Sequence, residues 1–105
     1  MQIPLQITTR GMDVSEAVDK AVRKHVAKLE HFSDRIVSCR VTVEVPESHQ
    51  QQGKLHAVHV DLRVPGDEII SSHAHENMDV YVALRDAFSA VQRRLEDHVR
   101  RQRGQ

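Results

Sequence analysis

Lysine and arginine side chains recur at helical spacing in two stretches of this sequence, and they are the residues best placed to do chemistry. In residues 13–32, three lysines follow one another at i, i+4 and i+8, with an arginine beside them. In residues 78–102, two pairs of arginines are each separated by seven residues. Such spacings put side chains on one face of a helix, where fixed rows of cations can neutralise the phosphates of RNA. The candidate RNA-binding residues are Lys20, Arg23, Lys24, Lys28, Arg93, Arg94, Arg100 and Arg101.

A solvated helix face whose charges pair with one another is the alternative explanation for these residues. It has most force in the second stretch, because acids stand among the arginines there. Glu96–Arg100, Asp97–Arg101 and Arg93–Asp97 all have the i,i+4 spacing of helical ion pairs. Both explanations stay open from the sequence alone.

The distribution of charge says more than its total. The chain has 15 Lys and Arg against 15 Asp and Glu, so bulk charge does not indicate a nucleic-acid-binding protein. Residues 77–105, however, hold six arginines against four acids, whereas residues 33–76 hold four basic residues against seven acids. A local basic patch can steer an anionic partner even on a neutral protein. Aromatic residues are only 3% of the chain, so we expect backbone and shape contacts to RNA rather than base stacking.

Histidine and cysteine are the other residues that could bind a ligand. The chain has eight histidines, and His73 and His75 stand two apart on one face of a predicted strand, where both rings could reach one metal ion. A closed zinc site takes about four ligands, and Cys39 has no cysteine partner. We therefore expect no metal, with His73 and His75 as weak candidates. Cys39 has the parity of an apolar strand face, which favours a buried small side chain over a reactive thiol.

Several classes of protein find no support in the sequence. It contains no GxSxG, P-loop, GxGxxG or HExxH motif and no carboxylate pair in an apolar setting. We therefore expect no enzyme, no cofactor and no small-molecule substrate. No run approaches the roughly 20 apolar residues of a membrane span, and the N-terminus lacks the features of a secretory signal. We expect a cytoplasmic protein with no membrane partner, and one domain over residues 1–105.

Apolar residues that alternate, or that recur at helical spacing, predict the strands and helices that position the basic rows. Asp13, with Glu16 three residues later, is the expected N-cap of the first helix. The apolar stripe of that helix consists of Val14, Val18, Ala21, Val22, His25, Leu29 and Phe32. The predicted elements are strand 2–8, helix 13–32, strands 36–46, 55–64 and 68–75, and helix 78–102.

The order β-α-β-β-β-α predicts an α+β fold with a four-stranded mixed sheet and two helices packed on one face. The first two strands should be parallel because a β-α-β connection crosses over right-handed. Strands two to four should form an antiparallel meander. The uncovered sheet face should be wet and carry Arg40, Thr42, Glu44, His59, Asp61 and Arg63.

Short stretches along the whole chain resemble the ribosome hibernation-promoting factors, also called ribosome-associated inhibitor or sigma modulation proteins. The start of the first helix, its end with the entry to the next strand, and the second helix all carry the likeness. The matching residues are Asp13-Val14-Ser15-Glu16-Ala17, Ala27-Lys28-Leu29-Glu30, Phe32, Asp34-Arg35-Ile36, Asp79-Val80-Tyr81, Ala83-Leu84, Arg93, Leu95 and His98.

The resemblance implies a β-α-β-β-β-α fold, similar in plan to double-stranded-RNA-binding domains. It also implies a partner, the small ribosomal subunit and its rRNA, with the protein lying over the channel for messenger and transfer RNA and blocking translation. Lys28 and Arg93 are the best-matched basic residues, and Arg35 matches the family signature too. The alternative is a protein-interaction or regulatory module that uses the exposed sheet face, including Arg40 and Arg63. The sequence leaves the oligomeric state open.

Overall fold

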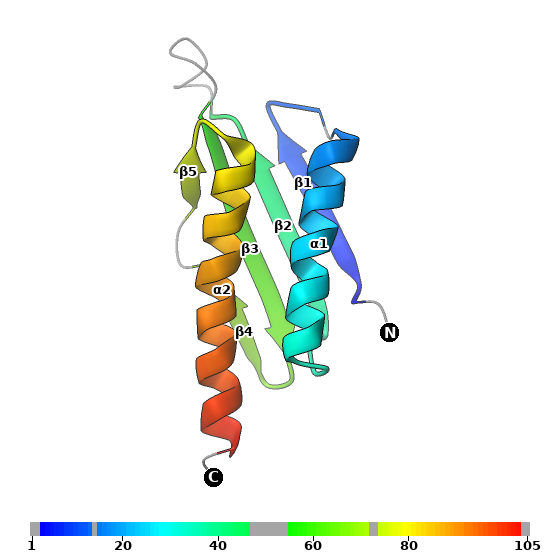
Figure 1. The fold of residues 1–105 in the computed structure, drawn as a ribbon, viewed down its shortest axis with the longest axis vertical. Helices are drawn as coiled ribbons and strands as arrows, with labels where there is room; N and C mark the ends of the chain where they lie inside the picture. Colours follow the sequence, from blue (N-terminus) through cyan, green and yellow to red (C-terminus); the bar gives the residue numbers. More distant parts are fainter. Residues whose placement is uncertain (1–2, 14, 47–54, 72–73, 104–105) are drawn as a thin grey trace.

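Two helices lie over one face of a mixed β-sheet (Figure 1). A computed structural model describes residues 3–13, 15–46, 55–71 and 74–103. Within these residues no helix covers the opposite face of the sheet (Figure 1). The predicted α+β architecture is confirmed. In chain order the elements are β1 (Leu5–Arg10), α1 (Glu16–Phe32), β2 (Ser38–Glu44), β3 (His56–Val64), β4 (Asp67–Ile70), β5 (His75–Asn77) and α2 (Val80–Arg103).

The strand order in the sheet is β1-β2-β3-β4, with β5 also paired to β3. β1 runs parallel to β2, with Leu5 opposite Cys39, as the right-handed crossover through α1 predicts. β2 and β3 are antiparallel, as are β3 and β4, so the predicted meander is confirmed. β1 lies at the edge of the sheet, which suits Pro4 just before it because proline cannot donate a ladder hydrogen bond.

The single strand predicted over residues 68–75 is wrong, because β4 and β5 are two short strands on the same side of β3. Asp61 lies opposite Ile70, whereas Val58 lies opposite His75. A shift of three residues along β3 therefore corresponds to a shift of five residues along the β4–β5 segment. Ser71 holds the chain to β3 at this break. Its backbone N–H donates to the Val60 carbonyl at 3.0 Å, and its Oγ accepts from the Val60 N–H at 3.2 Å.

Alternating valines on the central strands and apolar stripes on the helices make one core. The strands contribute side chains such as Val41 and Val60, and Leu29 and Leu84 come from α1 and α2. The polar strand residues named above are exposed or half-buried, which confirms the wet face. Cys39 is buried, and burial followed by the nearby Asp61 charge raises the pKa of its thiol to about 12. The predicted structural role of Cys39 is confirmed, because a thiol with that pKa stays protonated near neutral pH.

Side-chain caps fix where the helices begin. The expected N-cap at Asp13 is wrong, because Ser15 holds the extended backbone of the cap position and its Oγ accepts from the Val18 N–H at 3.1 Å. In α2, Asp79 Oδ1 accepts from the Tyr81 N–H at 2.9 Å, and Asn77 Oδ1 accepts from the Asp79 N–H at 2.9 Å. The predicted start of this helix at residue 78 is thus confirmed to within two residues.

Candidate nucleic-acid interface

Positive charge gathers on the helix layer and negative charge on the sheet. α1 and α2 together carry ten Lys and Arg against six Asp and Glu. The five strands carry three arginines against five acids. Since both helices lie on the same face of the sheet (Figure 1), an anion approaching the molecule meets a favourable potential on the helix side.

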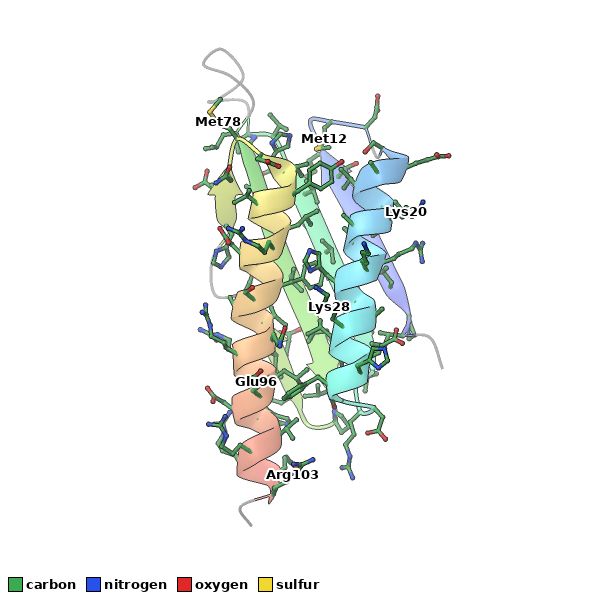
Figure 2. The ribbon with its side chains drawn as sticks, viewed as in Figure 1. Met12, Lys20, Lys28, Met78, Glu96 and Arg103 are labelled. Carbon is green, nitrogen blue, oxygen red and sulfur yellow. The ribbon has the colours of Figure 1, made fainter. Side chains whose placement is uncertain are left out.

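The lysine row of α1 lies opposite the buried residues of that helix. Val18, Val22, Val26 and Leu29 face the core, whereas Lys20, Lys24 and Lys28 are exposed. Because four residues overshoot a helical turn by about 40°, each lysine of the row is turned further toward α2 than the one before. Figure 2 shows Lys20 on the outer side of α1 and Lys28 on the side that faces α2. None of the three forms an ion pair with any residue that the structure describes.

Arg93 and Arg100 point away from the sheet on α2, opposite Val91 and Leu95 in the core. Arg93 has no ion pair within the described part of the chain. Arg100 Nη1 lies 3.7 Å from Asp97 Oδ1, an i,i+3 pair between exposed groups. The alternative explanation of self-pairing is therefore weak here, because a single exposed pair contributes at most about 1 kcal/mol.

The three i,i+4 pairs that the spacing allowed are absent among the described residues. Arg100 pairs with Asp97 rather than with Glu96. Glu96 Oε1 instead accepts a hydrogen bond of 3.4 Å from Gln92 Nε2. Asp97 forms an ion pair with neither Arg93 nor Arg101, both of which the structure describes. Two of the cations on this helix, Arg93 and Arg101, are therefore available to an external anion.

The remaining three predicted cations lie on the flanks of the helix layer. Arg23 Nε pairs with Asp19 Oδ2 at 2.9 Å. It shares a row with Glu30, whose Oε1 accepts from the Ile3 N–H at 3.2 Å, so this row faces β1. Arg94 and Arg101 share the flank of α2 that faces away from α1. On this flank Arg101 borders a small hollow at the β3–β4 turn. Of the eight predicted residues, the structure brings five onto the outward side: Lys20, Lys24, Lys28, Arg93 and Arg100.

A stacked pair of rings sets the spacing between the two basic rows. The imidazole of His25 and the ring of Phe88 have centroids 4.8 Å apart and planes 9° from parallel. His25 was part of the predicted apolar stripe, and it is half-buried between the helices. Burial, followed by the charge of Lys28, lowers the pKa of His25. The neutral ring lets the helices pack closely, so the rows hold a fixed separation.

The described residues include only one of the two histidine candidates for a metal. His75 lies in β5 opposite Val58, on the side of the sheet that faces the helices. His73 lies outside the described residues. In the described part of the chain, no group of three or more histidine, cysteine, aspartate or glutamate side chains could hold a metal ion. The helices that the structure describes include none with the length and apolar character to cross a membrane.

A mixed sheet covered on one face by two basic helices defines an α+β class whose helix layer suits an anionic partner. Residues 5–103 match the family described as Sigma 54 modulation protein / S30EA ribosomal protein, and the chain belongs to that family. A ribosome hibernation promoting factor of Escherichia coli is 32% identical over 95 residues, which cover 90% of each chain.

Two further comparisons bear on length and fold. A ribosome hibernation promotion factor of Deinococcus radiodurans is 30% identical over 90% of this chain, and the chain spans 48% of that relative's length. The structure of a ribosomal subunit interface protein from Coxiella burnetii superimposes with a TM-score of 0.77, at 18% identity over 91% of this chain and 97% of that one. At that identity the likeness supports the fold alone. The family and its relatives agree with the resemblance drawn from the sequence.

Proposed function

We infer that this protein binds the small ribosomal subunit through its rRNA, with the outward side of α1 and α2 as the contact surface. In this position it covers the channel for messenger and transfer RNA and inhibits translation by occupancy, in the cytoplasm, with no reaction catalysed. Family membership and relatives named as hibernation factors support a ribosome-associated role. The observation that carries the choice of surface is the set of five outward cations on one side of the sheet.

Phosphate neutralisation supplies the binding energy in this proposal. Lys20, Lys24, Lys28 and Arg93 make no ion pair with a described residue, so no internal pair must break before they meet phosphates. Arg100 would lose its weak, exposed ion pair with Asp97 and gain an ion pair with a phosphate. The rows lie on packed helices, so their geometry is set before binding and little ordering entropy is lost.

The flanking cations have a secondary part. Arg23 is held by Asp19 at 2.9 Å, and Arg94 and Arg101 face away from α1. We assign them to contacts at the margins of the surface, where RNA that curves around the helix layer would reach them. Their removal should therefore weaken binding less than removal of Lys28 or Arg93.

Co-sedimentation with purified small subunits tests the proposal. The protein should pellet with the subunits at low salt and stay in the supernatant at high salt, because binding through several phosphates falls steeply with ionic strength. Added messenger and initiator transfer RNA should compete with it for the subunit. Equal pelleting with and without subunits would exclude this function. Binding that changes neither with salt concentration nor with added competitor RNA would exclude it too.

A further inference from the structure

Two of the three aromatic residues lie at the surface, although the low aromatic content predicts little stacking. Phe32 is 41% exposed and Tyr81 is 47% exposed, whereas Phe88 is in the core. Phe32 ends α1, and Ser33 caps that helix with its backbone N–H on the Leu29 carbonyl at 3.0 Å. The chain then turns away toward β2 and leaves the phenyl ring partly exposed. The predicted stripe placed Phe32 in the core, and the structure does not.

The exposed ring of Phe32 forms part of a cleft of about 580 Å³ between the C-terminal ends of the two helices. Val99 and Leu95 of α2 give the cleft an apolar lining, and Arg35 and Arg103 border it from the α1–β2 connection and the last turn of α2. Figure 2 shows Arg103 on the side of α2 that faces α1. The volume falls in the range of about 300–1,000 Å³ that small-ligand sites occupy.

Charges around the cleft favour an anion. Neither Arg35 nor Arg103 forms an ion pair with a residue in the described ranges. Of the two acids that line the cleft, Glu30 accepts a hydrogen bond from the Ile3 N–H at 3.2 Å, which ties it to the β1 side. Asp34 is the remaining carboxylate and is exposed. A partly exposed aromatic ring, beside two guanidinium groups that form no ion pair with a described residue, matches a nucleobase with its phosphates.

The cleft also continues the proposed RNA surface. Lys20, Lys24, Lys28 and Phe32 follow one another at i, i+4, i+8 and i+12 along α1. Each step advances about 6 Å along the helix, so the row of lysines leads directly to the ring. A strand whose phosphates follow the lysines would bring its next base to Phe32.

We propose that this cleft binds one unpaired nucleotide of RNA, with its base stacked on Phe32 and its flanking phosphates held by Arg35 and Arg103. The proposal rests on the proposed function, since it names a subsite of the same RNA surface. Stacking on a protein ring is tolerant of base identity, so the subsite requires an unstacked base rather than a particular one.

A single fluorophore tests the cleft without the ribosome. The chain has no tryptophan, so Phe32→Trp places the only indole at the cleft. A short oligoadenylate should quench this fluorescence saturably, because the base stacks on the indole. Inorganic polyphosphate, which offers charge without bases, should bind without quenching. Absence of quenching by the oligoadenylate, or equal quenching by both polymers, would overturn the proposal.

Ribosome affinity gives a second measurement with a matched control. Phe32→Leu keeps an apolar side chain but removes the ring, and it should weaken binding to small subunits by about 5- to 150-fold, the range for loss of one stacked base. Phe32→Trp keeps an aromatic ring for stacking and should weaken binding less than Phe32→Leu does. The control Val37→Ala truncates an apolar side chain of similar exposure, 52%, that does not line the cleft, and it should change nothing. Unchanged affinity in Phe32→Leu, with the wild type still pelleting, overturns the nucleotide subsite and leaves the proposed function standing.

Discussion

The imidazole of His25 stacks on the ring of Phe88 with 4.8 Å between centroids, and this contact joins the two helices that carry the basic rows. The His25 imidazole is half-buried, and Lys28 lies one turn further along α1. Both surroundings disfavour a charged imidazole, burial most of all. The packing of the helix layer is therefore linked to the protonation of this histidine.

Stability should fall on acidification because of His25. Its pKa in the folded protein lies below the ordinary histidine value of about 6.5. Between these two pKa values His25 is protonated in the unfolded chain but neutral in the folded protein. The resulting contribution is complete above pH 6.5 and is lost as the pH falls from there toward the folded pKa. Thermal unfolding followed by circular dichroism between pH 7.5 and about 5 measures it.

The variant His25→Phe isolates this effect, because it keeps an aromatic ring against Phe88 and cannot titrate. The melting temperature of the variant should decline less than that of the wild type over the same pH range. Parallel declines in the two proteins would show that His25 is not the group responsible.

Ser71 should matter for stability although it lies outside the helix layer. Its hydroxyl accepts from the buried Val60 N–H at the break between β4 and β5. Ser71→Ala leaves that donor without this partner, and the free energy of unfolding should fall by about 1–3 kcal/mol. Urea denaturation measures the loss. Ser89→Ala, an exposed change on α2, should stay within about 0.5 kcal/mol of the wild type, and an equally small effect at Ser71 would refute the expectation.

A single phosphate contact should be visible in the salt dependence of binding. Log K falls as log salt rises. If Arg93 neutralises one rRNA phosphate, Arg93→Gln should make this negative slope shallower by about 0.7–1. Arg40→Gln removes an equal charge from the opposite face of the sheet and should leave the slope unchanged. Binding to small subunits at four or five salt concentrations gives both slopes, and equal slopes for the two variants would remove Arg93 from the contact surface.

The layers of the fold could be predicted from the sequence because burial on a sheet has a period of two. Val41 and Val43 alternate with Thr42 and Glu44, and that alternation alone fixes which face is covered. The break at Ser71 could not be predicted in this way, since it depends on how two strands share β3 as a partner. The choice of Ser15 over Asp13 as N-cap depends on which residue adopts the extended backbone, and both types favour that position.

The basic rows were predictable as rows, but not how they sit relative to each other. Spacing puts Arg94 and Arg101 together, yet only the packing of α2 on the sheet determines that their flank faces away from α1. The same packing brings Arg93 and Arg100 to the outside. The cleft at Phe32 also escaped prediction, because the cover of that ring depends on the path of the chain after Ser33 and on Arg103 at the far end of the sequence.

The affinity of two matched triple variants for small ribosomal subunits tests the choice of surface most directly. One variant combines Lys24→Glu, Lys28→Glu and Arg93→Glu on the helix side. The other combines Arg10→Glu, Arg40→Glu and Arg63→Glu on the sheet side, so both change the net charge equally. Circular dichroism verifies that both are folded.

The helix-side variant should lose affinity by on the order of 100-fold or more, because each reversal replaces a phosphate contact with repulsion. The sheet-side variant should bind nearly as the wild type does. The opposite result, with binding lost only in the sheet-side variant, would contradict the account and assign the interaction to the exposed sheet.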